Sequence, residues 1–164
     1  MQSVNNVGGE IMKRFFVVLI LTLVIAGGLT YFMPRDFSSY VSDITSDGMV
    51  SIYCRQSELD GISLGSGLMV QGKVDEMQNL LTKCQGVDGI SVSFSGSKQD
   101  VDRIVKLLNL TVNDSYTVSG VNVVCGLSSK ISGGVVIDGQ AVNAQIAYKD
   151  GVVTVGSPLI LGEY

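Results

Sequence analysis

Paired carboxylates are the side chains in this sequence whose spacing comes closest to a catalytic arrangement. Asp75 stands next to Glu76, and Asp100 lies two residues from Asp102. In glycoside hydrolases, two Asp or Glu side chains flank the glycosidic bond, and one of them acts as the acid and the other as the base. Both pairs, however, stand where helices are expected to begin, and acidic residues there stabilise free amides and the positive end of the helix dipole. We therefore expect these carboxylates to cap helices, and the sequence predicts no catalytic residue.

The residue types that are missing narrow the chemistry further. The chain has no histidine, the commonest general base and metal ligand, so Ser–His–Asp and Cys–His catalysis are excluded within it. Three cysteines are one short of a four-cysteine zinc site. The glycines at 61, 65 and 67 are not followed by the Gly-Lys-Ser/Thr of a phosphate loop. The sequence predicts a protein that is not an enzyme and needs neither metal nor cofactor.

Cysteines and tyrosines are the remaining candidates for a site. Each cysteine falls on an apolar face, where a free thiol behaves as a small buried hydrophobe. A disulfide between two of them is the alternative in an oxidising compartment. The cysteines are Cys54, Cys84 and Cys125. If the protein binds a ligand, the candidate binding aromatics are Tyr53, Tyr116 and Tyr148.

The charge distribution argues against nucleic acids as partners. The chain carries a net charge of −4, and after Arg35 there are 8 basic against 14 acidic residues. A nucleic-acid-binding protein needs a basic face to displace counterions from phosphates. In this chain lysines and arginines occur singly within an acidic domain. We therefore expect no nucleic-acid partner.

An uncharged stretch near the N-terminus predicts the location of the chain. Residues 15–33 carry no charge and are long enough to span a bilayer as a helix, and Lys13 and Arg14 precede them. The positive-inside rule then places the domain outside the cytoplasm of a single-pass protein whose helix contacts the membrane. The alternatives are a cleaved signal sequence with a secreted domain, and a buried core helix. The predicted parts are a cytoplasmic N-terminus 1–14, the helix or signal 15–33, a juxtamembrane linker 34–48 with a possible short amphipathic helix, and an extracytoplasmic domain 49–164.

Hydrophobic periodicity predicts an α+β domain. Apolar residues recur at helical spacing over 74–85 and again after Ser97, where Ser-x-x-Asp is typical of a helix start. Alternation predicts strands over 49–55, 68–71 and 89–95 and two strands within 116–125. Asp-Gly pairs at 138–139 and 150–151 predict tight hairpins over 135–142 and 144–155. The predicted fold is a transmembrane helix followed by two helices on an antiparallel or mixed sheet, ending in a β-meander.

The C-terminal quarter of the chain resembles a known family. Asn143-x-Gln145-Ile146-Ala147, the run Gly156-Ser-Pro-Leu-Ile160 and the final Glu-Tyr are similar to the tail of the YwmB family of Firmicutes. That resemblance implies an exported α+β domain of a Gram-positive bacterium, with a fold similar to that of the TATA-box-binding protein. It implies no activity and no DNA binding.

Two functions remain as expectations. The first is a membrane-anchored extracytoplasmic domain that binds envelope proteins or copies of itself, because strand edges rich in glycine can pair with other chains. The alternative is a secreted domain that binds a small ligand or a cell-wall glycan in a cleft. An unpaired edge strand would favour the first, and a tyrosine-lined cleft the second.

Overall fold

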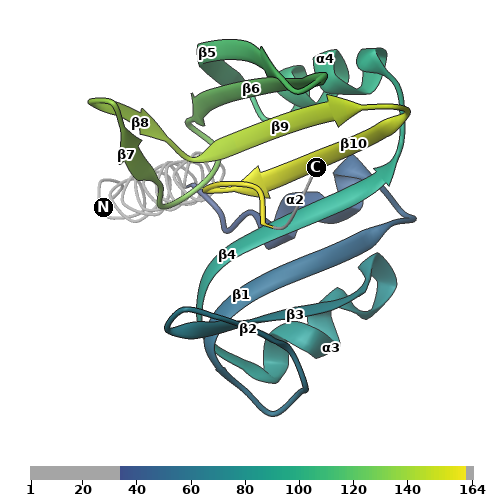
Figure 1. Cartoon of the computed structure of the whole chain (residues 1–164), viewed down its shortest axis with the longest axis vertical. Coiled ribbons are helices and arrows are strands. Elements are labelled where there is room, and N and C mark those ends of the chain that lie inside the picture. Colours follow the sequence, from purple (N-terminus) through teal and green to yellow (C-terminus); the bar gives the residue numbers. More distant parts are fainter. Residues whose placement is uncertain (1–33, 162–164) are drawn as a thin grey trace, which may run out of the picture. The chain divides into compact units, whose positions relative to one another are not determined.

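Residues 34–161 of the chain are described by a computed structural model (Figure 1). Its helices are the α-helices α2 (Ser38–Ile44), α3 (Met77–Thr82) and α4 (Lys98–Leu107) and the 3-10 helix η1 (Val74–Glu76). Its strands are β1 (Met49–Ser57), β2 (Ile62–Leu64), β3 (Gly67–Lys73), β4 (Cys84–Ser95), β5 (Leu110–Val118), β6 (Val121–Ser128), β7 (Val135–Ile137), β8 (Gln140–Val142), β9 (Ala144–Lys149) and β10 (Val152–Ser157).

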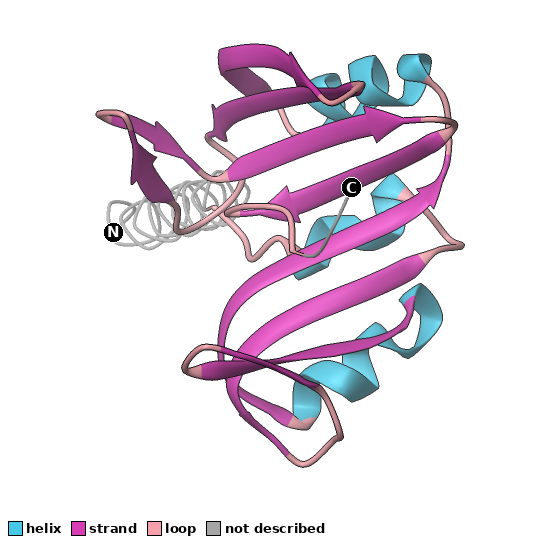
Figure 2. Ribbon diagram, viewed as in Figure 1, coloured by secondary structure: helices cyan, strands magenta, loops and turns pink. Residues whose placement is uncertain are grey.

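Eight strands form one sheet in the order β2-β3-β1-β4-β10-β9-β6-β5. Every neighbouring pair in it is antiparallel. Strands β7 and β8 pair with each other as a separate hairpin. Helices α2, α3 and α4 all lie behind the same face of the sheet (Figures 1 and 2). The opposite face, called the open face below, is therefore free of helices.

The main core lies between the helices and the sheet. Alternate residues of each strand face it, as the two-residue period of a strand requires. The largest buried side chains of this layer include Val50, Ile52, Val92, Ile146, Val153 and Val155 from the strands and Val41, Ile104 and Leu108 from the helical side. Because all three helices contribute to one apolar layer, the described residues share a continuous core.

The stretch predicted as a linker belongs to the folded domain. The domain unit begins at Pro34. The short amphipathic helix expected there is α2, and Phe37 just before it and Val41 and Ile44 within it are all nearly inaccessible to water. Two nitrogen atoms of Arg103 donate to main-chain oxygens at the end of this helix, at 3.3 and 2.8 Å. Residues 34–48 therefore help to build the core.

Both Asp-Gly hairpins are confirmed. The first pair joins β7 to β8, and the second joins β9 to β10. Asp138 and Asp150 have φ angles of 49° and 48°, and Gly139 and Gly151 follow with 79° and 83°. Two consecutive positive φ angles match the right-handed twist of the flanking strands, which explains the preference for these residues in two-residue turns.

The helix predicted over 74–85 is shorter than expected. It consists of η1 and α3 and ends at Thr82, and β4 begins at Cys84. Cys84 pairs with Ser57 of β1. Residues 84 and 85 are therefore in a strand, although the apolar spacing of the sequence is that of a helix. Gly86, directly after the predicted helix, lies inside the strand with a φ of 64°. The helix predicted after Ser97 is confirmed as α4.

The predicted fold class is wrong as it was stated. Among residues 34–161 no helix is long and apolar enough to cross a membrane. Segment 15–33, on which the transmembrane helix was predicted, lies outside the described residues. Three α-helices, rather than two, pack on the sheet. The coarser statement is correct: the fold is α+β with few helices and an antiparallel sheet.

Candidate functional site

Alternate side chains of seven strands point toward the open face. Side chains of paired residues line up across the strands and form rows. One row consists of Lys73, Met49, Ser93, Thr154, Ala147, Val123 and Tyr116, in order from β3 to β5. The adjacent row consists of Gln71, Ser51, Ser91, Gly156, Gln145, Cys125 and Asp114. Because helices cover the other face, these rows are the exposed surface of the sheet.

Short polar side chains pair with each other near the middle of the open face. The hydroxyls of Ser93 and Thr154 lie 2.9 Å apart across β4 and β10. Gln71 Nε2 donates to Ser51 Oγ at 3.0 Å across β3 and β1. Cross-strand pairs of this kind stabilise a sheet. These residues therefore hold neighbouring strands together, and their geometry does not suggest a reactive group.

Residues 158–161, here called the closing segment, follow β10 and fold back across the open face (Figure 1). Ser91 Oγ in β4 accepts a hydrogen bond from the Leu161 N–H and donates one to the Leu161 carbonyl, each at 3.3 Å. Gln145 Oε1 in β9 accepts from the Ile160 N–H at 3.1 Å. The exposed fractions of Ser91 and Gln145 are only 2% and 7%. Two buried side chains thus recognise main-chain atoms of the segment.

The closing segment runs over glycines and covers a second apolar cluster. A Cβ atom at Gly156 would lie 2.6 Å from the Cα of Ile160, closer than real side chains approach. Leu159 and Ile160 pack on the cluster, which lies on the open-face side of the sheet. Its buried members are Val121, Val123, Cys125, Val142 and Ala147. The segment therefore acts as a lid on apolar surface that the helices do not reach.

Strand β5 forms one edge of the sheet, and its side chains are largely exposed. It is nine residues long, whereas the opposite edge strand, β2, has three residues. Val112, Tyr116 and Val118 are among the exposed large apolar residues, and half of Val118 is accessible. Natural edge strands are commonly protected by Lys or Pro. The β5 sequence contains neither of these residues.

A β-bulge reverses the side-chain alternation within β5. Val112 pairs with Gly126, and Asp114 pairs with the next residue of β6, Cys125, so Asn113 is extra. Asn113 Nδ2 donates to the Ala141 carbonyl of β8 at 2.7 Å. A bulge of this kind redirects every later side chain. It allows the start of β5 to face the main core while Asp114 and the following alternate residues face the open side.

A pocket of about 360 Å³ lies between the bulged strand and the β7–β8 hairpin. Tyr116 and Ile137 give it apolar surface. Asn113, Asp114, Asp138, Gln140 and Gln145 supply polar groups. One aromatic side chain beside amides and carboxylates is the composition of a small-ligand site.

A second cavity, of about 660 Å³, lies between the start of α2, the start of β4 and the loop 132–135. It is lined by two carboxylates, and each has a partner. Ser132 Oγ donates to Asp36 Oδ1 at 2.9 Å, and Arg55 Nε donates to Asp88 Oδ2 at 3.2 Å. Because both acids are engaged in structural contacts, this cavity does not resemble the paired-carboxylate arrangement of a hydrolase.

The three candidate tyrosines do not form one cleft. Tyr148 faces the main core and packs against it. Tyr53 and Tyr116 face the open side, but β4, β10, β9 and β6 separate their strands. Tyr53 donates a hydrogen bond to the Leu64 carbonyl at 3.1 Å and supports β2. Tyr116 lines a pocket beside the β7–β8 hairpin.

The three cysteines are free thiols in the structure, and two of them are neighbours. Cys54 is buried on the core side of β1. Burial, followed by the adjacent Cys84 thiol, raises the pKa of Cys54 to about 11. Cys125 is buried on the open-face side, where Gln145 Nε2 lies 3.4 Å from its sulfur. The raised pKa of Cys54 keeps this thiol mostly protonated at neutral pH and makes it a weak nucleophile.

The acidic pairs lie at helix starts, as predicted. Asp100 Oδ2 accepts from the Ser97 N–H at 2.9 Å and from the Ser97 hydroxyl at 3.0 Å. These bonds hold the pKa of Asp100 below its ordinary value. At the other helix, Glu76 Oε2 accepts from the Lys73 N–H at 3.4 Å. A carboxyl group that is stabilised in its charged form is a poor general acid.

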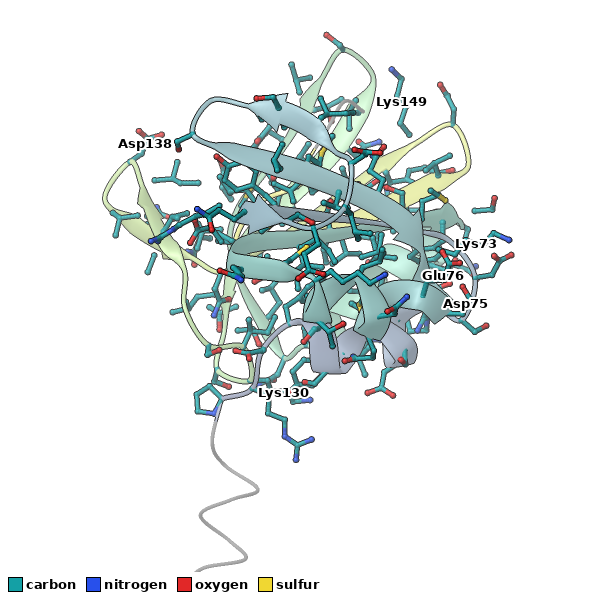
Figure 3. All side chains as sticks on the ribbon, turned by 90° about the horizontal axis from the view of Figure 1, so that it is seen from below. Lys73, Asp75, Glu76, Lys130, Asp138 and Lys149 are labelled. Atoms are coloured by element: carbon teal, nitrogen blue, oxygen red, sulfur yellow. The ribbon has the colours of Figure 1, made fainter. Side chains whose placement is uncertain are left out.

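Charged side chains point outward around the periphery of the domain (Figure 3). Lys73, Asp75 and Glu76 lie together on one side, while Asp138 lies at the hairpin tip on another. Lys130 Nζ donates to the carbonyl of Leu107, near the end of α4, at 2.6 Å. Within residues 34–161 no group of three or more potential metal ligands was found. The charges do not converge on a common point.

The chain matches none of the family models, curated proteins or solved structures with which it was compared.

Proposed function

We propose that the domain of residues 34–161 is a non-enzymatic interaction domain that works outside the cytoplasm and binds a partner protein by strand addition to β5. The partner is an envelope protein or a second copy of the chain. In this mode an extended segment pairs with the free edge through main-chain hydrogen bonds, and exposed side chains of the edge provide specificity.

The observation that carries this proposal is the exposed edge of β5 after its bulge, residues 115–118. A long edge strand is a template for another strand, and proteins normally block it with charge, proline, a bulge or a short length. β5 is nine residues long, and its bulge and its single charged residue, Asp114, both precede residues 115–118. Val112, Tyr116 and Val118 add exposed apolar contacts along it.

The proposed location rests on the sequence. Lys13 and Arg14 precede the uncharged residues 15–33, a pattern typical of exported chains. The resemblance of residues 142–164 to the YwmB family supports the same location. Protease added to intact cells of a Gram-positive host would then digest the domain. Complete protection until the cells are lysed would contradict export.

Cross-linking in that host tests the strand-addition mode. The full chain carries a photo-reactive residue in place of Thr117, in the exposed half of β5. Cross-linked peptides identified by mass spectrometry should join β5 to an extended segment of the partner. Val118→Lys places a charge on the edge and should reduce cross-linking at least tenfold.

Val136→Lys is the matched control, because Val136 has an exposed fraction of 73% and lies on the β7–β8 hairpin. It should leave the β5 cross-links unchanged. Equal loss in both variants, or cross-links that survive Val118→Lys, would contradict strand addition to β5.

Binding of a small ligand or wall glycan is the second candidate, and the pocket beside Tyr116 favours it specifically. Sugars stack on aromatic rings and bond to amides and carboxylates, which this pocket offers through Asn113, Asp114 and Gln140. Titration with soluble muropeptides should shift the amide NMR signals of these residues. Tyr116→Ala should abolish the shifts and Tyr53→Ala should not. Shifts at neither site would exclude this candidate.

A further inference from the structure

The cavity of about 660 Å³ beside the start of α2 has the size of a small-molecule site. Pockets of about 300–1,000 Å³ hold drug-sized ligands in proteins. The cavity lies where the end of β10 and the start of β4 meet α2, which covers this side of the sheet (Figure 2). None of its lining residues belongs to β5 or to the pocket beside Tyr116. It is therefore a separate candidate site.

Apolar side chains form one wall of the cavity. Ile90 in β4 belongs to the main core. Leu81 of α3 and Val87 of β4 add to this wall, and 39% of Val87 remains exposed. A ligand with an apolar body would remove this surface from water, which is favourable.

Ser157 is a buried polar residue whose side chain has no partner. Its exposed fraction is 8%, and its hydroxyl makes no hydrogen bond with the residues that the structure describes. Side chains alternate along β10, so Ser157 points to the same side of the sheet as Val153 and Val155, which lie in the main core. It therefore points toward the cavity that it lines.

The Ser157 hydroxyl is reached from this cavity. Among residues 34–161 no side-chain oxygen or nitrogen is both sealed from water and without a partner. The unpartnered oxygen of Ser157 is therefore accessible, although its residue is more than nine-tenths buried. A buried hydroxyl gains a hydrogen bond when a ligand offers a polar atom.

Asp36 places a fixed negative charge at the rim of the cavity. The Arg35 N–H donates to the Lys130 carbonyl at 2.8 Å, and the Ser132 N–H donates to the Arg35 carbonyl at 2.9 Å. These bonds hold the chain before α2 against the loop. Ser132 Oγ donates to Asp36 Oδ1 at 2.9 Å. The other oxygen, Oδ2, accepts no hydrogen bond from residues 34–161, so it is available to a ligand.

The charges around the cavity favour a cation. No lysine or arginine is among the described residues that line it. Arg55 pairs with Asp88 through two nitrogen atoms, at 3.2 and 3.4 Å, so Asp36 supplies the charge that is not compensated. An ammonium group has three donors and no acceptor, which suits a carboxylate oxygen. An anion would be repelled by the same carboxylate.

We propose that this cavity binds a small organic ammonium compound with an apolar body. The ammonium group donates to Asp36 Oδ2 at the rim. The apolar body contacts Leu81 and Val87, and the Ser157 hydroxyl bonds to a polar atom at the inner end of the ligand. This site does not depend on the strand addition proposed for β5.

Three probes that share one body test the charge preference. Tyramine has an ammonium group, an aromatic ring and a hydroxyl at the far end. Its neutral analogue is 4-hydroxyphenethyl alcohol, and its anionic analogue is 3-(4-hydroxyphenyl)propionate. Titration calorimetry with the full chain should show tyramine binding about fivefold more tightly than the alcohol, and no binding of the anion. Equal affinities, or no binding of tyramine, overturn the proposal.

Asp36→Asn tests the carboxylate. Asparagine retains an oxygen that can accept from Ser132, but it has no charge. The variant should bind tyramine about fivefold more weakly and the neutral alcohol unchanged. Asp43→Asn is the matched control, because Asp43 is an exposed residue of the same helix and does not line the cavity. Unchanged tyramine affinity in Asp36→Asn overturns the proposal.

Ser157→Ala tests the inner contact and keeps the proposal falsifiable if Asp36→Asn does not fold. Because the Ser157 hydroxyl has no internal partner, its removal should not lower the free energy of unfolding. Tyramine affinity should fall about threefold, and that of phenethylamine, which lacks the far hydroxyl, should stay the same. Ser95→Ala, at an exposed position, should change neither affinity. Tyramine affinity that is unchanged in Ser157→Ala contradicts the assigned contact.

Binding at the cavity and binding at the β5 edge can be told apart. Tyramine should shift the amide NMR signals of Leu81 and Val87, which line the cavity. Val118→Lys and Tyr116→Ala should leave its affinity unchanged. Tyramine affinity that is lost with either substitution would place the ligand elsewhere and overturn the proposal. Failure of partner cross-linking at β5 would leave the tyramine results unaffected.

Discussion

Ser91 Oγ is bonded to both main-chain polar atoms of Leu161, at 3.3 Å each, although 70 positions separate the two residues. One buried hydroxyl thus fixes the path of the segment that follows the last strand. Because the contact involves main-chain atoms, it survives changes in the side chain of Leu161. The hydroxyl of Ser91 is therefore the group whose removal should matter most for the position of this segment.

Replacing Ser91 with Ala should free the end of the closing segment. The substitution leaves the N–H and carbonyl of Leu161 without their partner, at a cost of about 1 kcal/mol in the free energy of unfolding. Hydrogen exchange at the Leu161 amide should accelerate, and urea denaturation measures the loss. Ser95→Ala, at an exposed position of the same strand, should change neither quantity. Similar effects of the two substitutions would contradict the role assigned to Ser91.

Asp100 should make the stability of the domain depend on acid pH. Its pKa is held below the ordinary 3.8 by the Ser97 N–H, then by the Ser97 hydroxyl. The stabilisation is therefore complete above pH 3.8 and disappears as the pH falls through the lower, folded-state value. The urea midpoint of the wild type should fall over this range more than that of Asp100→Asn.

The control for this carboxylate is Asp102→Asn, because Asp102 is exposed two residues further along α4. That variant should retain the acid-dependent loss of stability. If Asp100→Asn retained it equally, the capping role of Asp100 would be wrong.

Cys54 should resist alkylation in the folded protein. Its pKa of about 11, raised first by burial and then by the Cys84 thiol, leaves almost no thiolate at about pH 8. Cys84 is only half-buried and should react first with iodoacetamide. Mass spectrometry of native and urea-unfolded samples gives the order of labelling. Labelling of Cys54 before Cys84 in the native state would refute this assignment.

Ile146 should contribute more to stability than any exposed valine. It is completely buried in the main core on β9. Ile146→Ala leaves a cavity and should reduce the free energy of unfolding by about 2–5 kcal/mol. Val136→Ala, on the exposed hairpin, should change it by less than about 0.5 kcal/mol. Chemical denaturation of both variants measures the free energy of unfolding. Equal losses in the two variants would contradict the central position of Ile146 in the core.

Local signals in the sequence predicted local features of the fold. The Asp-Gly pairs predicted two hairpins because few residues accept consecutive positive φ angles. The Ser-x-x-Asp motif predicted the start of α4 because it satisfies free amides. A short amphipathic helix within residues 34–48 was expected, but its burial depends on strands more distant in the sequence.

The features that could not be predicted depend on pairing between strands that are distant in the sequence. The start of β4 at Cys84 depends on pairing with β1, which overrides the helical pattern before it. The face on which Tyr148 lies depends on strand register, and one residue of slip would reverse it. The contact of the closing segment with the open face was missed because Ser91 and Gln145 bind main-chain atoms. Contacts of that kind leave no motif in the segment that is bound.

The position of β10 has a consequence for how the chain folds. β10 is the last strand in the described sequence, yet it lies between β4 and β9 in the middle of the sheet. The strands on its two sides cannot join until synthesis has passed residue 157. Such non-local pairing slows folding, so the sheet closes as one late step after the remaining strands have been synthesised.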